Sequence, residues 1–360
     1  MIQNIQIRNF KSIENQTFYF KPLTILTGKN SSGKSSVIQA ILFYINKIKE
    51  ESSLTNYLGH LGIQKDLFFM NAKKKECFIL PTINGKKMPS MNMIFDGDET
   101  RNNDISKVTK LIPQFEQDIF FLSANRIGQE DIANSNATLR CGVNGEFIFG
   151  FYEYNKNEPL SNKKLLSNEQ DKLGHQVDFW LNKILLLNLA LNTQAIIGTS
   201  VKVSYKNFDL DNLNGVEMSP FNLGAGVSYL AKILILGLSL KEGDILIVEN
   251  PEVHLHPNAI ANFAEFFAFL AQNGIQVILE THSEHILNKM RYFVFDKKSS
   301  LDKIQLSTDD VQIYYRENFD KEFIALNINN DGRYIDKEGK VVNFPTGFFD
   351  SVLNDLLEMF

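Results

Sequence analysis

The chain has 360 residues, of which 44% are hydrophobic and 22% are charged, a balance that predicts a globular protein and excludes extensive disorder. Its formal net charge of -5 predicts no general attraction to nucleic acid. The two cysteines, Cys77 and Cys141, lack the spacing of a metal site or a disulfide framework. There is no signal-peptide pattern, and no apolar run approaches the ~20 residues that a membrane helix needs, so we expect a cytoplasmic protein without membrane contact.

The N-terminal segments predict strands followed by a helix. Residues 2–10 alternate between apolar and polar side chains, which is typical of a strand with one buried face. Residues 17–20 and 23–26 continue this pattern. Apolar residues then recur at helical spacing between positions 37 and 45.

The loop between the last of these strands and the helix carries the strongest signal in the chain. Residues 28–35 fit the phosphate-loop pattern G-x-x-x-x-G-K-[ST] at every fixed position. The glycines let the backbone wrap around phosphates, whose charge is balanced by amide groups and by the positive end of the helix. We expect Lys34 to reach the β and γ phosphates and Ser35 to hold Mg²⁺. The predicted contacts with ATP are Asn30, Ser31, Ser32, Gly33, Lys34, Ser35 and Ser36.

The middle of the chain gives mixed signals and is interpreted as an inserted α/β lobe over residues 54–220. Its expected elements are strands at residues 78–80 and 147–154, turns at 84–85 and 144–145, and a helix at 177–191. The ATPase core would then consist of residues 1–53 and 221–360.

From residue 243 onward, strands and helices alternate. We expect strands at residues 245–248 and 276–279 and helices at 257–272 and 284–292. The apolar strand before Glu249 has a Walker-B arrangement, because a carboxylate at the end of a buried strand can face magnesium. The next strand ends before Glu280 and His282. Upstream, residues 222–228 form a glycine-flanked helix start that suits an anion.

The order of these four elements resembles that of ATP-binding-cassette ATPase heads. The branch in question contains the structural-maintenance-of-chromosomes (SMC), RecF-like and OLD (overcoming-lysogenisation-defect) ATPases. Residues 5–12, 121–128, 249–257 and 331–350 are each similar to segments of this branch, the last of them to compact, stand-alone bacterial members. The resemblance implies an α/β P-loop NTPase fold with a mixed sheet and an inserted lobe.

The resemblance also implies a second protomer. In such heads a signature element contacts the γ phosphate that is bound by another copy, and the matching residues here are Gly224, Gly226 and Ser228. ATP would then close a head-to-head homodimer.

Three further roles follow from the resemblance. Glu249 takes the carboxylate role beside magnesium, and His282 takes the role of the switch histidine that senses the γ phosphate. Gln64 is the expected link between magnesium and the lobe, although its position near Asp66 is equally typical of a surface residue.

One position departs from the family pattern. Cassette ATPases usually carry the general-base glutamate directly after the first carboxylate, where this chain has Asn250. An amide cannot accept a proton near neutral pH, although it can orient the attacking water. We therefore expect slow hydrolysis or a different base, with Glu252 as the first candidate and Glu280 as the second.

Other conspicuous residues have simpler interpretations. His254 and His256 could suggest a transition-metal site, but no third ligand is evident. The D-x-D pairs at 96–98 and 209–211 are interpreted as solvated turns rather than as a nuclease site. The residues that follow Tyr292 number about seventy, too few for an appended nuclease domain of the Toprim kind.

The resemblance implies a function as well as a fold. Because similar proteins often serve bacterial defence against phage or mobile DNA, we expect a dimerising ATP switch that controls a separate nuclease or toxin. One alternative is a scaffold that binds ATP tightly and hardly hydrolyses it, which Asn250 would favour. Another is a RecF-like head that binds DNA, for which the lysine runs at 73–75, 86–87 and 297–298 are the candidate contacts.

Overall fold

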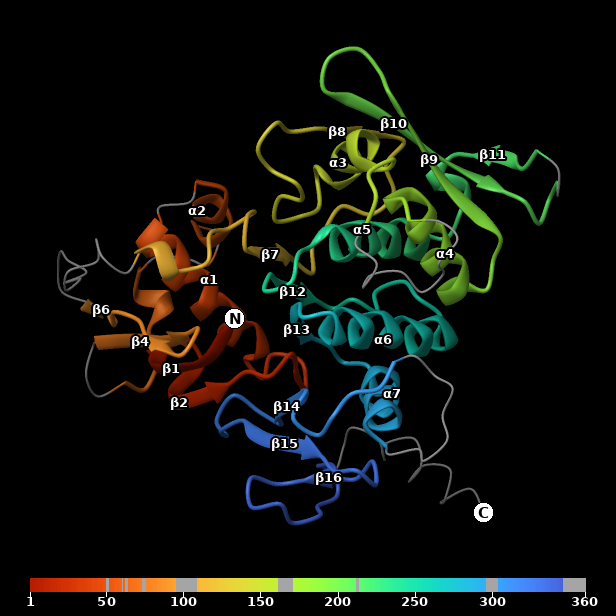
Figure 1. Cartoon of the computed structure of the whole chain (residues 1–360). Coiled ribbons are helices and arrows are strands. Elements are labelled where there is room, and N and C mark those ends of the chain that lie inside the picture. The colour runs from red at the N-terminus through yellow and green to blue at the C-terminus, as the bar shows by residue number, and fades with distance from the viewer. Residues whose placement is uncertain are drawn as a thin grey trace. The chain divides into compact units, whose positions relative to one another are not determined.

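The computed structural model of the chain is shown in Figure 1. It describes residues 1–49, 52–59, 61, 64–72, 76–94, 109–160, 171–211, 214–295 and 304–345. The chain divides into two compact units, a first unit of Met1–Ile119 with Ile278–Phe360 and a second unit of Phe120–Val277. Among the described residues, no helix has the length and apolar character required to cross a membrane.

The first unit begins with a five-stranded antiparallel sheet. Its strands are β1 (Ile2–Phe10), β2 (Ile13–Tyr19), β4 (Glu76–Ile83), β5 (Lys86–Lys87) and β6 (Met91–Ile94). β1 pairs with β2 on one side and β4 on the other, and β4 pairs with β5 and β6. Asn84 and Gly85 both have positive φ between β4 and β5, as a two-residue hairpin turn requires.

A seven-stranded mixed sheet has the order β16-β15-β14-β3-β13-β12-β7. Its strands are β3 (Leu23–Gly28), β7 (Ile119–Leu122), β12 (Ile245–Glu249), β13 (Gln276–Glu280), β14 (Val311–Arg316), β15 (Ile324–Ile328) and β16 (Tyr334–Ile335). β14 runs parallel to β3 and antiparallel to β15. β3, β12, β13 and β14 are buried along their whole length, which explains their continuous apolar sequences.

The helices described in the first unit are α1 (Lys34–Lys49), α2 (Ser52–Gly59) and α7 (Glu284–Val294). α1 begins at the end of the phosphate loop, and α7 begins two residues after His282, with Ser283 as its N-cap. The short 3₁₀ turns η1 (Gln64–Leu67) and η2 (Thr109–Leu111) also belong to this unit.

Within its described residues, the second unit combines a small sheet with four helices. Its sheet contains β8 (Ile132–Asn134), β9 (Leu189–Ala195), β10 (Ser200–Asn207) and β11 (Val216–Met218). Its helices are α3 (Ile148–Asn155), α4 (Leu173–Leu185), α5 (Ala225–Ser239) and α6 (Pro257–Gln272), with the 3₁₀ turn η4 (Pro220–Asn222) before α5. α4 packs on α5 and α6 (Figure 1). The Trp180 ring of α4 lies edge-on to Phe266, with 5.0 Å between the ring centroids.

Several predicted elements are confirmed with small changes at their ends. The helix predicted at residues 257–272 is α6, whose start is fixed by His256 as N-cap and by Pro257 in the first turn. The helix predicted at 177–191 is α4, but it ends at Leu185 because Leu186 adopts a left-handed conformation with φ of 56°. The chain then turns into β9.

The strand predicted at residues 147–154 is wrong, because this segment forms α3. Its aromatic side chains favour a strand on composition alone. However, Tyr152 is buried on the packed side of the helix, and a Cβ atom at Gly150 would lie 2.4 Å from the carbonyl oxygen of Asn134. Close tertiary packing therefore overrides the local preference.

The predicted lobe boundaries at residues 54 and 220 do not coincide with the boundaries of the two units. β4 and β6 lie inside the predicted lobe, yet they extend the sheet of β1 in the first unit. The partner of a strand is not recorded in its own sequence, and this pairing across about seventy residues was therefore not foreseen.

Candidate nucleotide site

The phosphate loop of the first unit has a backbone that only glycine can adopt at two positions. Gly28 and Gly33 have φ values of 141° and 92°. A Cβ atom at Gly28 would lie 2.0 Å from the carbonyl oxygen of Arg316, and one at Gly33 would lie 2.0 Å from Ser12 Oγ. Both glycines are therefore required by the neighbouring backbone and side chains as well as by the turn of the loop.

Lys34 lies across this loop. Its side chain is only 3% exposed, and Nζ donates hydrogen bonds to the carbonyl oxygens of Gly28 at 3.2 Å and Lys29 at 2.8 Å. A buried ammonium group is costly unless its hydrogen bonds are satisfied. The loop thus holds a positive charge where a phosphate chain would lie against the start of α1.

The next residue, Ser35, contacts a carboxylate from a distant strand. Ser35 Oγ donates a hydrogen bond of 2.9 Å to Glu280 Oε1, and Glu280 is 5% exposed at the end of β13. A hydroxyl and a carboxylate are oxygen ligands of the kind that Mg²⁺ prefers. The residues present therefore fit a magnesium ion beside a bound triphosphate.

Two buried hydroxyl groups near the loop are consistent with a ligand site. Thr27 Oγ1 and Ser32 Oγ have no hydrogen-bond partner within the described part of the chain. Buried polar atoms are normally paired, and unpaired ones call for an explanation. A loop that closes on phosphate oxygens would explain why these two hydroxyl groups are unpaired.

A cavity of about 870 Å³ opens above the loop. Ser31 and the residues from Gly33 to Ser36 line one part of it, with Glu280 and His282 beside them. The turn that contains Lys11 and Ser12 and a segment around Phe69 line the rest, together with Phe319. The structure thus brings five of the seven predicted Walker A residues and His282 into one cavity, whereas Asn30 and Ser32 are not in its lining.

His282 follows β13 and is held near the loop. Partial burial, and next the charge of Lys34, lower the pKa of His282 below its usual value, while a hydrogen bond to the carbonyl of Gly28 opposes this shift. The imidazole is therefore neutral at pH 7. A negatively charged phosphate at this place would favour its protonated form.

Glu249, the predicted Walker-B residue, lies in the second unit, at the end of β12. It is 6% exposed, and its Oε2 accepts a hydrogen bond of 2.9 Å from the backbone N–H of Ala124. The carbonyl oxygens of Glu249 and Asn250 accept hydrogen bonds from Arg126 at 2.7 and 2.8 Å. The predicted carboxylate is therefore held in place by the segment after β7.

Sequence reasoning missed the role of Arg126. It is 2% exposed, and burial lowers its pKa to about 10, which leaves the guanidinium charged at neutral pH. Its guanidinium also lies 5.2 Å from the ring centroid of Tyr229 in α5. The only signal in the sequence was the similarity of residues 121–128 to a family segment, to which no role was attached.

Asn250, the position that departs from the family pattern, has a strained backbone. Its φ is 45°, a left-handed conformation that asparagine tolerates better than most residues. Its Oδ1 is buried without a hydrogen-bond partner in the described residues. The nearby Glu252 is half-buried, and its charge helps to stabilise the Arg126 guanidinium.

The three predicted signature residues have different surroundings in the second unit. Gly224 is the exposed N-cap of α5, whereas a Cβ at the buried Gly226 would lie 2.4 Å from the carbonyl oxygen of His254. Ser228 is 1% exposed, and its Oγ lies 3.5 Å from Tyr205 Oη. Because Ser228 faces the interior, its predicted contact with a second protomer has no support in this structure.

The structure describes only some of the remaining predicted site residues. The side chain of Gln64, the D-x-D pair at 96–98 and the lysine runs at 73–75 and 297–298 lie outside the described residues. The described ranges contain no cluster of three or more His, Cys, Asp and Glu side chains that could hold a metal. His256 instead caps α6, since its Nδ1 accepts a hydrogen bond from the N–H of Asn258.

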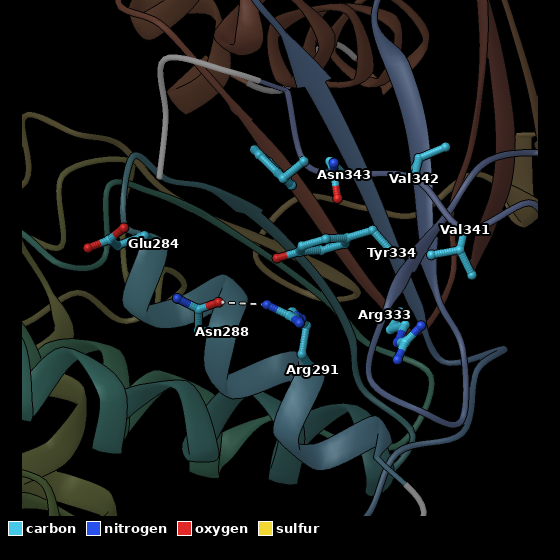
Figure 2. A pocket seen from close by; sticks show the side chains of 9 residues that line it. Glu284, Asn288, Arg291, Arg333, Tyr334, Val341, Val342 and Asn343 are labelled. Atoms are coloured by element: carbon cyan, nitrogen blue, oxygen red, sulfur yellow. Dashed lines mark hydrogen bonds between the residues drawn. The ribbon is translucent and has the colours of Figure 1, made fainter. Parts of the chain in front are cut away.

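A second cavity of the first unit, of about 560 Å³, shares no lining residue with the first (Figure 2). It lies between α7 and the C-terminal strand region, with the Tyr334 ring at its centre. Arg291 donates hydrogen bonds to Asn288 Oδ1 at 3.2 Å and to the carbonyl of Gly332 at 2.7 Å. The polar groups of this second cavity join α7 to the strand region. The cavity is not lined by the phosphate loop that lines the other cavity.

Three family models match the chain. A model described as "AAA domain, putative AbiEii toxin, Type IV TA system" matches residues 93–288, and one described as "AAA ATPase domain" matches residues 1–183. A third, "Protein of unknown function (DUF3696)", matches residues 306–359.

Two curated relatives are similar over part of their length. The Old nuclease of Escherichia phage P2 is 23% identical over 338 residues, which cover 80% of this chain and 57% of the relative. The ATP/GTP phosphatase of Helicobacter pylori (strain ATCC 700392 / 26695) is 28% identical over 128 residues, which cover 32% of this chain and 33% of the relative. The chain thus spans about half of the first relative and a third of the second.

Solved structures establish the fold. An SMC head bound to the C-winged helix domain of ScpA aligns with a TM-score of 0.56 at 12% identity, over 91% of this chain and 97% of that one. An SMC head with an extended coiled coil from Pyrococcus furiosus aligns with a TM-score of 0.53 at 12% identity, over 99% of both chains. The fold is therefore the predicted α/β P-loop NTPase, in the form of an ABC-type ATPase head of the OLD and SMC kind. Because two family models each cover more than half of its residues, the chain belongs to the AAA ATPase domain family.

Proposed function

We propose that this chain binds a nucleoside triphosphate with Mg²⁺ in the cavity above the phosphate loop and hydrolyses its γ phosphate. The observation that carries the proposal is the contact of Ser35 Oγ with Glu280 Oε1 beside the buried ammonium of Lys34. A positive charge, a hydroxyl and a carboxylate then line one cavity at the start of a helix.

Each group has a chemical task in this proposal. Loop amides and Lys34 neutralise the charge that develops on the phosphate oxygens. Bound Mg²⁺ would be held by Ser35, whose hydroxyl lies next to the Glu280 carboxylate. The ion would supply further charge stabilisation. Glu280 accepts the proton of the water that attacks the γ phosphorus, while the bond to the bridging oxygen breaks and ADP leaves. His282 interacts with the γ phosphate.

The geometry changes the order of the two candidate bases. Glu280 lines the cavity that contains Lys34 and Ser35. We therefore place Glu280 before Glu252 as the general base. We still expect slow turnover, because the amide side chain of Asn250 cannot accept a proton.

We further propose that ATP closes a homodimer. The start of α5 supports this, since Gly224 is exposed and α5 has no side-chain N-cap hydrogen bond. Phe221, just before it, is 59% exposed. An exposed helix start next to an apolar side chain fits a surface that meets an anion held by another copy.

The biological role that we propose is an ATP switch in the cytoplasm that controls a separate nuclease or toxin in defence against phage or plasmids. The support is the similarity to the Old nuclease and to a family model whose description includes a putative toxin of a toxin–antitoxin system. Lys86 and Lys87, exposed on β5, are the described lysines that a DNA-binding alternative would use.

Steady-state phosphate release from ATP and Mg²⁺ tests the proposal. Lys34→Ala should lower the rate roughly 10²-fold or more, because the charge that faces the phosphates is lost. The matched control is Lys29→Ala in the same loop, whose side chain is 46% exposed and lies 3.4 Å from Glu317. The control should stay within about twofold of the native rate.

Two results would contradict the proposal. Equal rates for the native chain and Lys34→Ala would show that the phosphate loop is not the site of hydrolysis. Tight ATP binding with no phosphate release from the native chain would instead favour the scaffold alternative. Light scattering with and without ATP, on a variant with slowed turnover, measures the proposed dimer.

A further inference from the structure

The second cavity of the first unit has a chemical character of its own (Figure 2). Its volume of about 560 Å³ lies within the range of about 300 to 1,000 Å³ that is typical of small-molecule sites. It shares no lining residue with the cavity above the phosphate loop. A nucleotide bound at the loop therefore does not account for it.

One wall of this second cavity is apolar and preformed. The Tyr334 ring, which is 5% exposed, packs against Phe344 with 5.0 Å between the ring centroids. The guanidinium of Arg291 lies 4.9 Å from the centroid of the same ring. Val341 continues the wall and is 49% exposed. An apolar group placed here would bury Val341 against side chains that are already fixed.

Two arginines lie at one end of the cavity. Arg291 of α7 is held there, because its Nε donates a hydrogen bond of 2.7 Å to the carbonyl of Gly332 and its Nη1 donates one of 3.2 Å to Asn288 Oδ1. These bonds occupy two of the five donors of a guanidinium. Arg333 directly follows Gly332, is exposed, and also lines the cavity. The contact with Gly332 thus brings the two arginines to the same end.

The charges in the cavity are separated. Within the described part of the chain, neither Arg291 nor Arg333 forms an ion pair with a carboxylate. Glu284, the acidic residue of the lining, is the first residue of α7 and lies at the opposite end from Arg333 in Figure 2. Guanidinium groups typically form bidentate hydrogen bonds with carboxylate or phosphate oxygens. One end therefore suits an oxyanion, and the other disfavours a second negative charge.

The cavity combines parts of the chain that different family models match. Glu284 and Asn288 lie within residues 93–288, which the AAA domain model matches, whereas the residues from Arg333 to Phe344 lie within residues 306–359, which the third model matches. A site here belongs to the combined chain rather than to the AAA domain alone.

We propose that this cavity binds a small molecule that carries one carboxylate or phosphate group on an apolar body. Arg291 and Arg333 hold the oxyanion, and Tyr334 and Val341 contact the apolar body. Carboxylate and phosphate offer the same kind of oxygen acceptor to a guanidinium, and titration distinguishes between them. The proposal is independent of the proposed function, because it needs no ligand at the phosphate loop.

Calorimetric titration of the whole chain tests the site. The Lys34→Ala variant is used, so that the loop has lost the ammonium that would compete for anions. Phenyl phosphate or phenylacetate should bind with a dissociation constant in the millimolar range or below. Benzyl alcohol, which lacks the charge, and inorganic phosphate and acetate, which lack the apolar body, should bind at least about tenfold more weakly. The tighter of the two anionic aromatic probes identifies the head group.

Two variants locate the probe in the cavity. Arg333→Gln should weaken the tighter probe about tenfold, because a charge-assisted hydrogen bond is lost. Since Arg333 is exposed, the urea midpoint should not change. Val341→Asp, which places a negative charge on the apolar wall, should weaken the same probe. The matched control is Lys340→Gln, which removes an exposed positive charge outside the lining and should leave the affinity within about twofold.

Three results would overturn the proposal. They are binding of neither anionic aromatic probe, equal affinity for these probes and benzyl alcohol, and unchanged affinity of the tighter probe in Arg333→Gln. A native chain that fails to bind ATP would contradict the proposed function and leave this second site standing.

Discussion

Two buried glutamates, one in each unit, end apolar strands of similar sequence, yet their surroundings differ. Glu280 is the last residue of β13 in the first unit and accepts a hydrogen bond from Ser35 of the phosphate loop. Glu249 is the last residue of β12 in the second unit and accepts a hydrogen bond from the backbone N–H of Ala124. The first carboxylate therefore contacts a side chain of the nucleotide cavity, whereas the second contacts the protein backbone.

The difference teaches that an acidic residue at a strand end is not sufficient evidence of its role. A strand followed by a carboxylate is typical of the Walker-B position, and the sequence favoured Glu249 for the metal and Glu252 for the proton. The side-chain contacts add Glu280, which the pattern ranked behind Glu252. The contact partner, rather than the strand pattern, indicates which group can act on a bound ligand.

The largest expected effect separates these carboxylates directly. Glu280→Gln should lower kcat for ATP hydrolysis by roughly 10²- to 10⁴-fold, because an amide cannot accept the proton of the attacking water. Nucleotide affinity should change much less. Single-turnover phosphate release and equilibrium binding measure the two quantities separately.

Glu252→Gln is the matched rival in the same assay. If Glu280 is the base, this variant should retain most of its turnover. Loss of turnover in Glu252→Gln with normal rates in Glu280→Gln would restore the sequence-based assignment and break the comparison.

Arg126→Met should have the next largest effect, and on stability. The variant removes hydrogen bonds to the buried carbonyls of Glu249 and Asn250, and it leaves those oxygens without their donors. The expected loss in the free energy of unfolding is about 2 to 4 kcal/mol. Urea unfolding measures it, and Lys29→Ala, an exposed substitution, should stay within about 0.5 kcal/mol of the native chain. A native-like midpoint in Arg126→Met would show that the hydrogen bonds of Arg126 do not stabilise the fold.

The smallest expected effect is a pH dependence with opposite signs in the two units. In the second unit, burial raises the pKa of Asp178 to about 7, although a hydrogen bond from the N–H of Leu191 lowers this pKa in part. The folded chain then binds more protons than the unfolded chain between about pH 4 and pH 7, so this group lowers stability as pH rises. Asp178→Asn should be more stable than the native chain at pH 8 by about 1 to 3 kcal/mol, and indistinguishable below pH 4.

His282 in the first unit has the opposite sign. Its folded-state pKa lies below the unfolded value, so its contribution is present above about pH 6.5 and is lost as pH falls through the folded pKa. Since this side chain is well exposed, only a small change is expected in His282→Asn. Unfolding curves at pH 5, 6.5 and 8 check both signs, and a stability difference for Asp178→Asn that does not depend on pH would contradict the first.

The phosphate loop could be predicted from sequence because its requirements are local. Gly28, Gly33 and Lys34 lie within seven residues, and each serves the backbone turn or the charge of a phosphate. The helices α6 and α7 were predicted for a similar reason, since periodicity and the capping residues are local signals.

The remaining features depend on contacts between residues that are distant in sequence. Ser35 and Glu280 are 245 positions apart, and Arg316 and Ser12 are 304 apart. Ser228 matched a family pattern, but its burial against Tyr205 depends on the packing of β10 on α5. Such contacts are set by tertiary packing, which hydrophobic periodicity does not encode.

Titration of ATP into the native chain and into Ser35→Ala, with and without Mg²⁺, tests the central claim most directly. The account predicts that the native chain binds ATP more tightly when Mg²⁺ is present, and that Ser35→Ala loses most of this gain while it remains folded. Equal, magnesium-dependent affinities for the two chains would contradict the assignment of Ser35 to the magnesium side of a triphosphate site.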